Sequence, residues 1–417
     1  MRLISGVIRG AIVALAVAAA QPALAQDKVI KFGTPQDFTV VYTFVTNEYN
    51  QGYRDYISLI NERGGVNGHK IEVLVADTGN APQRGIEAYE RFVREGAILI
   101  DPLSTPVSRA LVDRAMKDNI NLATTVSGRS DAADGSVFPF ILPMSPSYWS
   151  QIARVVDYLN TQEGGLKGKK LAFVYIDTPF GREGLPMLDA LSKRYGFELQ
   201  SFPYAPPGNE QSAVWTQVRR FKPDWAFIGG GGVGQPVSIK EAIRNGIKPD
   251  RIATWVWLSE SDMDVVGRAD AKGVLKWTAT EQGADAKIIK EIISGVVDKG
   301  KGAGPKEKVG TSYYNVGVMA AAIAVEGVKN ASEKNPNGPY DGKWLNAGLT
   351  SISKFTADGF LPPVTVTPED HQGGGAGKLA RWDGSRWVGI GDWAAPNQDL
   401  VWQLIREQSA QYKTTGK

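Results

Sequence analysis

The sequence predicts an α/β protein made of two doubly wound parallel sheets that follow one another along the chain. From residue 29 onward, short β-branched runs alternate with amphipathic helical stretches, which is typical of a parallel sheet covered by helices on both faces. This alternation completes one unit near residue 145, and a second, similar series then begins. The chain of 417 residues has room for two or three domains of ordinary size.

The first unit opens with a strand and an amphipathic helix. Tyr49, Tyr53, Tyr56 and Ile60 recur at intervals of three and four, which indicates a helix with one apolar face. This helix should end at the glycine pair 64–65, because glycine adopts the left-handed conformation found at helix ends. The other elements expected in this unit are strands at 29–33, 70–76, 97–100 and 121–124 and helices at 82–95 and 106–118.

The second unit repeats the same alternation. Its expected helices are 147–160, 182–195, 212–221 and 235–245, and its expected strands are 170–176, 198–202, 224–228 and 252–257. The remainder is too short for a third unit of this kind. It contains helices at 286–299 and 312–329, a short helix near Trp344, a Trp/Gly-rich hairpin at 378–393 and a last helix at 399–411.

We expect this remainder to complete first one lobe and then the other, with a cleft between them. Lobe one would then comprise residues 26–144 and 281–360. Lobe two would comprise residues 145–280 and 361–417, with hinge crossings near 144, 280 and 360.

Residues 1–25 have the pattern of a cleaved export signal. Arg2 and Arg9 precede an apolar run at 10–20, and Ala23-Leu24-Ala25 is the small-x-small pattern that signal peptidase cuts. No cysteine follows the cut to accept a lipid, and the longest later apolar stretch, 316–325, is about half of what a bilayer crossing needs. We therefore expect a periplasmic protein without stable membrane insertion.

Composition argues against several classes of function. The net charge of +3 and the lack of a dense Lys/Arg stripe argue against nucleic-acid binding. The absence of cysteine excludes disulfides, thiol nucleophiles and thiolate metal ligands. His69 and His371 are the only histidines, which argues against a metal site and against histidine-based catalysis. We expect a protein that is not an enzyme and needs no cofactor.

The segment 60–72, INERGGVNGHKIE, resembles the periplasmic leucine/isoleucine/valine-binding proteins, which carry an IN-x-x-GG-[IV]-x-G-x-K-[IL] pattern between the first helix and the second strand. The resemblance continues at Pro82-Gln83, Ser104-Thr105, Asp177-Thr178-Pro179-Phe180-Gly181, Gly229-Gly230 and Ala271-Lys272-Gly273-Val274-Leu275. It implies a type I periplasmic-binding fold, with two doubly wound parallel-sheet lobes joined by a multi-strand hinge.

The resemblance also implies a function. The chain would be the monomeric solute-binding component of an ABC importer, and it would deliver a small-molecule ligand to permease subunits in the inner membrane. The ligand would be a small amino acid or a partly apolar carboxylate or amide.

Candidate ligand contacts in lobe one lie in strand-to-helix turns, since doubly wound sheets bind ligands outside the carboxyl ends of their strands. Ser104 and Thr105 precede a helix start, where a hydroxyl and free backbone N–H groups suit a carboxylate. The alternative is an ordinary N-cap. Ser127 and Gly128 follow the fourth strand, where the resemblance implies a second hydroxyl and a backbone carbonyl. The alternative is that they only shape the turn.

In lobe two, the resemblance points to Phe180, at a position where the family usually has a tyrosine over the ligand; core packing is the alternative. Trp257 is expected at the ligand because it ends a strand, although it could equally pack in the core. Glu260 could pair with a ligand ammonium, as acidic residues near this position do in amino-acid-binding members. The alternative is an exposed loop acid.

The run 229–234 satisfies G-x-G-x-x-G after a strand and before a helix. We interpret Gly231 and Gly232 as positions where the backbone approaches the ligand closely. Two other functions stay open: an exported dinucleotide-dependent oxidoreductase that uses this run, and a ligand-sensing module for a membrane receptor. The resembled family often has a tyrosine in this turn too, where this sequence has glycine. Because this tyrosine hydroxyl and the one at Phe180 are both missing, the ligand class stays open between a branched-chain amino acid and an aromatic or aliphatic carboxylate or amide.

Overall fold

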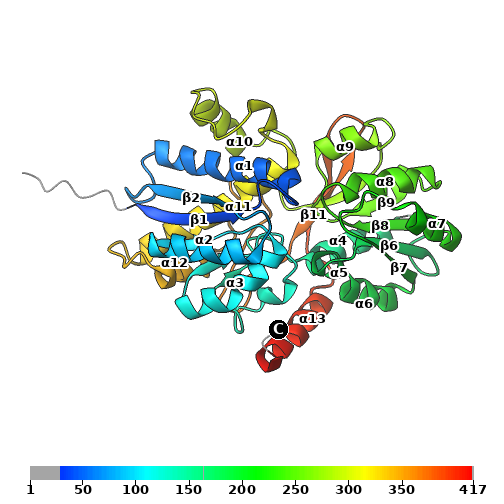
Figure 1. The fold of residues 1–417 in the computed structure, drawn as a ribbon, viewed down its shortest axis with the longest axis horizontal. Helices are drawn as coiled ribbons and strands as arrows, with labels where there is room; N and C mark the ends of the chain where they lie inside the picture. The colour runs from blue at the N-terminus through cyan, green and yellow to red at the C-terminus, as the bar shows by residue number, and fades with distance from the viewer. Residues whose placement is uncertain (1–28, 163, 416–417) are drawn as a thin grey trace, which may run out of the picture.

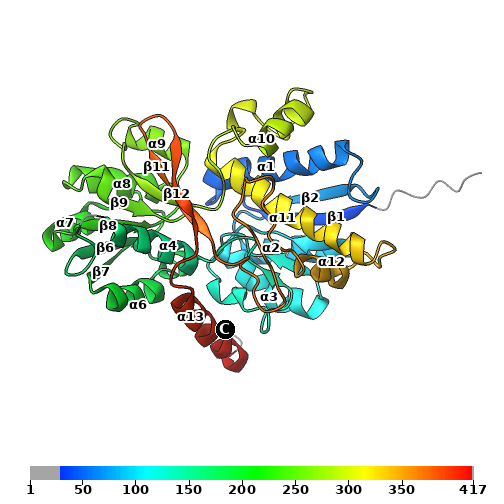
Figure 2. The same cartoon turned by 180° about the vertical axis from the view of Figure 1, so that it is seen from behind.

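The computed structural model describes residues 29–162 and 164–415 and shows two α/β lobes side by side (Figures 1 and 2). The export signal expected at residues 1–25 lies outside the described residues. None of the helices in the described part of the chain combines the length and the apolar composition that a bilayer crossing requires. The predicted fold class, two parallel-sheet lobes with alternating strands and helices, is confirmed.

Lobe one is built on an all-parallel sheet with strand order β2-β1-β3-β4-β5. Its strands are β1 (Ile30–Gln36), β2 (Ile71–Asp77), β3 (Ala97–Ile100), β4 (Asn121–Ala123) and β5 (Ile141–Leu142). Its first helices are α1 (Thr43–Glu62), α2 (Pro82–Arg94) and α3 (Thr105–Asp118), and the 3₁₀ turn η1 (Ser130–Ala133) follows β4. Strand β3 is buried along its whole length, as expected for a parallel strand covered on both faces.

Helices α11 (Ser312–Lys334) and α12 (Gly342–Leu349) return to lobe one, and α11 packs along α1. Two glycines allow the backbones of α1 and α11 to meet. A Cβ on Gly52 would lie 2.2 Å from the Tyr314 carbonyl oxygen, and one on Gly317 would lie 2.0 Å from the Tyr49 carbonyl oxygen. The apolar stretch 316–325 is therefore a buried helix, as the sequence predicted. Helix α10 (Lys287–Ile292) and its π-helical continuation η3 (Ile293–Val297) also contact α1.

Lobe two is built on a mixed sheet with strand order β12-β11-β10-β9-β8-β6-β7, in which β11 pairs antiparallel with both β10 and β12. Its strands are β6 (Lys170–Ile176), β7 (Glu198–Tyr204), β8 (Trp225–Gly229), β9 (Ile252–Thr254), β10 (Leu275–Thr278), β11 (Gly377–Trp382) and β12 (Trp387–Ala394). Its helices are α4 (Tyr148–Thr161), α5 (Pro179–Arg182), α6 (Leu185–Tyr195), α7 (Ser212–Phe221), α8 (Gly234–Arg244) and α9 (Glu260–Val266). The hairpin predicted at 378–393 is the β11–β12 pair.

Residues that follow position 360, where the sequence analysis placed the last crossing, still contact lobe one. The backbone N–H of His371 donates to the carbonyl of Ala133, and its Nδ1 lies 2.8 Å from the carbonyl oxygen of Ile141. Asp370 forms an isolated β-bridge with Asp134. Because these partners belong to lobe one, we propose that lobe one comprises residues 29–144 and 281–375 of the described chain. The last helix, α13 (Gln398–Thr415), contacts both lobes.

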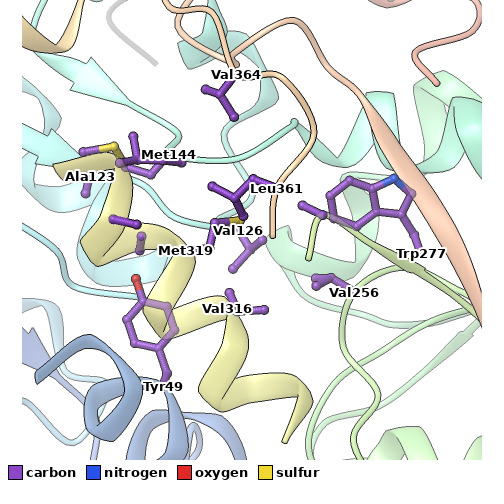
Figure 3. Close-up of a cluster of buried hydrophobic side chains, with 14 of the residues drawn as sticks. Tyr49, Ala123, Val126, Met144, Val256, Trp277, Val316, Met319, Leu361 and Val364 are labelled. Atoms are coloured by element: carbon purple, nitrogen blue, oxygen red, sulfur yellow. The ribbon is translucent and has the colours of Figure 1, made fainter. Parts of the chain in front are cut away.

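An apolar cluster continues through the junction of the lobes (Figure 3). In lobe one, Met319 and Val316 of α11 lie close to Leu361 and Val126. Trp277 of β10 belongs to the same cluster and extends it into lobe two. The segments that connect the two lobes are therefore packed against buried apolar side chains and are not exposed linkers.

Candidate functional site

A cleft of about 590 Å³ lies between the two lobes. On lobe one it is lined by the segment Val40 to Phe44 after β1, by Asn80, and by the start of α3. On lobe two it is lined by the turns that follow β6, β7, β8 and β9. These turns lie at the carboxyl ends of parallel strands, which is where doubly wound sheets bind ligands.

The described residues that line the cleft include no charged side chain. Four aromatic residues line it, Tyr42 and Phe44 from lobe one and Phe180 and Trp257 from lobe two. Valine and proline side chains supply much of the rest, and the polar side chains are threonine and asparagine. The cleft therefore suits a largely apolar ligand that makes a few directed hydrogen bonds.

Thr105 and Ser104 have different roles although they are neighbours. Ser104 is the N-cap of α3: its hydroxyl accepts the Val107 N–H and donates to Asn80 Oδ1 over 2.6 Å. Ser104 does not line the cleft, so the ordinary N-cap describes it. Thr105 does line the cleft, and its Oγ1 accepts the Gly128 N–H at 2.9 Å.

Tyr42 lies in front of the N-terminus of α3. Burial raises the pKa of Tyr42 to about 12, whereas hydrogen bonds with the side chain and backbone of Thr105 act in the opposite direction. The Tyr42 hydroxyl therefore occupies the polar groups of Thr105 at the start of α3. A helix N-terminus is in general suited to an anion.

Ser127 and Gly128 lie behind Thr105 and are not among the lining residues. The Ser127 hydroxyl pairs with that of Ser108 at 3.2 Å. The Gly128 carbonyl accepts two hydrogen bonds from the Arg109 guanidinium, at 3.2 and 2.8 Å. Both residues thus shape and support the turn that holds Thr105.

Phe180 and Trp257 both line the cleft and belong to one aromatic group. The Phe180 ring lies 5.6 Å from the ring of Tyr148, and the indole N–H of Trp257 donates to the Tyr148 hydroxyl. Trp257 also meets Phe44 of the opposite lobe edge to face, with ring centroids 6.2 Å apart. The two lobes are therefore in contact through aromatic rings at this end of the cleft.

Gly231 and Gly232 line the cleft in the turn between β8 and α8. Gly232 has a φ of +64°, and a Cβ there would lie 3.0 Å from the ring of Phe44. The absence of a side chain at this position allows Phe44 of lobe one to approach the turn. The turn faces the cleft between the lobes, so its position differs from that of the first turn of a separate dinucleotide-binding domain.

Glu260, which the sequence analysis placed near a ligand ammonium, is not among the residues that line the cleft, and its carboxylate is bound to another part of the chain. Its carboxylate accepts the backbone N–H of Ser312 at 3.0 Å and the Ser312 hydroxyl at 3.3 Å. Ser312 begins α11, so Glu260 of lobe two satisfies the N-terminus of a helix in lobe one. In addition, Ser259 and Asp262 form a capping box that begins α9 at Glu260.

The sequence analysis missed the loop after β1, which carries Val40, Val41 and Tyr42 into the cleft. The buried Asp37 carboxylate organises this loop by accepting the backbone N–H groups of these three residues at 2.7 to 2.9 Å. The loop is the first strand-to-helix turn of the sheet, so the rule that pointed to Thr105 points to it as well. No group of histidine, aspartate and glutamate in the described part of the chain is arranged to hold a metal ion.

The sequence and the structure of this chain are similar to those of periplasmic binding proteins over most of its length. A family model described as "Periplasmic binding protein" matches residues 29–386. No curated protein matches the sequence. A solved structure from the Pseudomonas fluorescens group, described as an ABC transporter permease, is 35% identical, with 93% of this chain and 97% of that chain covered and a TM-score of 0.86.

Two more distant structures share the fold. A branched chain amino acid ABC transporter from Thermus thermophilus with bound valine is 17% identical, with 91% of this chain and 98% of that chain covered and a TM-score of 0.75. A fatty acid ABC transporter substrate-binding protein from Thermomonospora curvata is 22% identical, with 89% and 93% covered and a TM-score of 0.74.

Proposed function

Because the chain belongs to the periplasmic binding protein family, we propose that it captures a partly apolar carboxylate or amide between its lobes for an ABC importer. In this proposal the protein binds its ligand without transforming it. It works as a periplasmic monomer that passes the ligand to permease subunits in the inner membrane.

The uncharged, aromatic lining of the cleft is the observation that carries the ligand class. An α-amino acid brings an ammonium group, and a buried ammonium without a partner is costly. Glu260, the acid expected to meet it, is bound to Ser312 instead. A carboxylate or amide without an ammonium avoids this cost.

The size of the cleft supports the same class. A volume of about 590 Å³ is typical of small-molecule sites, which span roughly 300–1,000 Å³. The distant structures described with bound valine and as a fatty acid binder both concern ligands with a carboxylate and an apolar part. In this chain, Thr105 and the N-terminus of α3 would hold the carboxylate, and the aromatic residues would cover the apolar part.

A thermal-shift screen with matched ligands tests the proposal. Ligand-stripped, refolded protein would be mixed with leucine, 4-methylpentanoate or 4-methylpentanamide, and with phenylalanine, 3-phenylpropanoate or 3-phenylpropanamide. Within each set the members differ only at the polar end. We expect the acids or the amides to raise Tm, and the amino acids to have little effect. A larger shift with the amino acids, or no shift with any compound, would contradict the ligand class.

Thr105→Ala should weaken binding of the acids roughly tenfold or more, because it removes a hydrogen bond to a charged group. Thr105→Ser keeps the hydroxyl and is the matched control, and its affinity should stay close to that of the wild type. Titration calorimetry with the tightest acid measures both. Equal affinity of Thr105→Ala and the wild type would remove Thr105 from the site.

A further inference from the structure

Helix α13 lies beneath the junction of the two lobes in both views (Figures 1 and 2). It covers residues Gln398–Thr415, beyond residue 386, where the match to the family model ends. It packs against η1 of lobe one and against α4 and α6 of lobe two. One helix therefore bridges the two lobes that the cleft separates.

The first turn of α13 is attached to lobe two and to a hinge crossing. Asp399 forms a two-pronged ion pair with Arg194 of α6, at 2.9 and 2.5 Å. The Gln398 side chain donates to Ser150 of α4 at 3.3 Å and accepts from Gln372 at 3.2 Å. Gln372 is next to the segment where the chain crosses back to β11, so this end of α13 contacts the hinge.

The last turns of α13 are attached to lobe one. Ser409, which is 1% exposed, donates to Asp134 Oδ2 at 2.6 Å. The Tyr412 hydroxyl donates to Asp113 of α3, and its ring lies 4.7 Å from that of Phe138. Val401, Ile405 and Ser409 are the buried residues of the helix. They recur every four positions, so one continuous stripe of α13 faces the protein.

Tyr412 also reaches the turn that supports Thr105. The Arg129 guanidinium lies against the rings of Phe138 and Tyr412, at 5.0 and 5.3 Å from their centroids. Arg129 directly follows Gly128, whose N–H donates to Thr105 Oγ1. On the other side of Arg129, the backbone N–H of Ser130 donates to the carboxylate of Glu183 in lobe two at 2.8 Å. The end of α13 thus contacts a turn of lobe one that is hydrogen-bonded both to Thr105 and to Glu183 of lobe two.

We propose that α13 is a strap that favours the contact between the lobes seen here, and that Tyr412 positions the turn 127–130 behind Thr105. Because α13 is held at both ends, separating the lobes requires it to leave one of them. The expected effect of Tyr412 on ligand affinity rests on the proposed function. The expected effect of α13 on the radius of gyration of the ligand-free protein does not depend on it.

Ile405→Glu in the full-length chain tests the strap, since a carboxylate in place of a fully buried isoleucine should detach the helix. Gln411→Glu introduces a carboxylate on the exposed face of α13 and is the control. Hydrogen exchange of residues 398–415 reports detachment, and small-angle scattering without ligand reports shape. We expect a larger radius of gyration for Ile405→Glu only. An unchanged radius with α13 detached, or α13 still protected in this variant, would overturn the proposal.

Tyr412→Ala tests the positioning role without a buried charge. We expect faster hydrogen exchange at Gly128 and Ser130 in the ligand-free variant, and a rise of roughly fivefold in Kd for 4-methylpentanoate. Lys413→Ala, on the exposed neighbour, should leave both unchanged. Unchanged exchange at this turn in Tyr412→Ala would overturn the positioning role. If 4-methylpentanoate does not bind at all, the ligand class is wrong, and the exchange and scattering results still decide the strap.

Discussion

Asp101 directly follows β3 and is 1% exposed. Its carboxylate accepts hydrogen bonds from the Tyr49 hydroxyl, from the Leu103 N–H at 3.2 Å and from the Thr125 hydroxyl at 3.3 Å. Burial raises the pKa of Asp101 to about 7, and these hydrogen bonds act in the opposite direction. The carboxyl group is therefore a source of pH dependence close to the site.

We predict that Asp101 lowers the free energy of unfolding as the pH rises from about 4 to about 7. In this range the folded protein, with its pKa of about 7, binds a proton more tightly than the unfolded chain, whose Asp pKa is near 4. The contribution is therefore largest at low pH and is lost as the pH rises. Over this range the wild type should lose up to about 4 kcal/mol relative to Asp101→Asn.

Urea unfolding of both proteins at several pH values between 4.5 and 7.5 measures this difference. Asp285→Asn, which changes an aspartate that is 88% exposed, is the control and should follow the wild type. Parallel curves for the wild type and Asp101→Asn would show that Asp101 does not titrate in this range.

Ser104 and Thr105 illustrate how far residue type alone predicts a site. Both are hydroxyl residues next to a helix start, and the sequence could place either of them at a ligand. In the structure, Ser104 points into the cap and toward Asn80, whereas Thr105 lines the cleft. The direction of each side chain depends on where α3 begins and on which turn packs behind it.

Two glycines of the turn between β8 and α8, Gly231 and Gly232, lie close to the ring of Phe44 in lobe one. Gly232 combines a positive φ with a nearby Phe44 ring, while Gly231 has an ordinary φ and more room, with its Cβ position 3.3 Å from that ring. A side chain at Gly232 would meet both backbone strain and the opposite lobe. A side chain at Gly231 would meet mainly the Phe44 ring of the opposite lobe.

We predict that Gly232→Ala destabilises the protein by about 1–2 kcal/mol, since a left-handed alanine costs about that much. It should also enlarge the ligand-free radius of gyration, because Phe44 must move away. Gly231→Ala is the matched control and should cost less. Urea unfolding and small-angle scattering compare the two, and equal losses would argue that backbone conformation is not the cause.

Helices and strands were predictable from sequence because each has its own period of apolar residues. Most of the alternating elements of both lobes, the buried helix α11 and the β11–β12 hairpin appear where they were predicted. Strand β5 was not predicted, and β9 ends at Thr254, three residues before Trp257, which was predicted to end it. Helix α9 was not predicted, although its Ser259 and Asp262 have the spacing of a capping box. The loop after β1 was not recognised as part of the site, because its order depends on the buried Asp37.

The molecule as a whole is two lobes that touch at several places across the cleft. Phe44 meets Trp257, the Ser130 N–H meets Glu183, and Ser312 meets Glu260. Each of these pairs joins lobe one to lobe two. A ligand in the cleft would contact both lobes and would add to these contacts.

We predict that ligand binding closes the two lobes. The ligand-stripped protein should have a larger radius of gyration than the protein saturated with the tightest compound of the screen. Because α13 already favours the contact between the lobes, the ligand has to supply less than the roughly 10⁴-fold preference for the closed form that a full shift from 1:99 to 99:1 requires. Small-angle scattering with and without ligand measures the change. An identical profile in both states would contradict closure by the ligand.

The α/β class, the two tandem units and the turns in which a site should lie can be read from the amino-acid sequence. These follow from local periodicity and from the rule that parallel strands end at one edge of a sheet. The packing of the elements shows that Thr105 and not Ser104 faces the cleft, that Glu260 caps α11, and that α13 bridges the lobes. Those outcomes depend on contacts between residues far apart in the sequence, which form only when the elements pack.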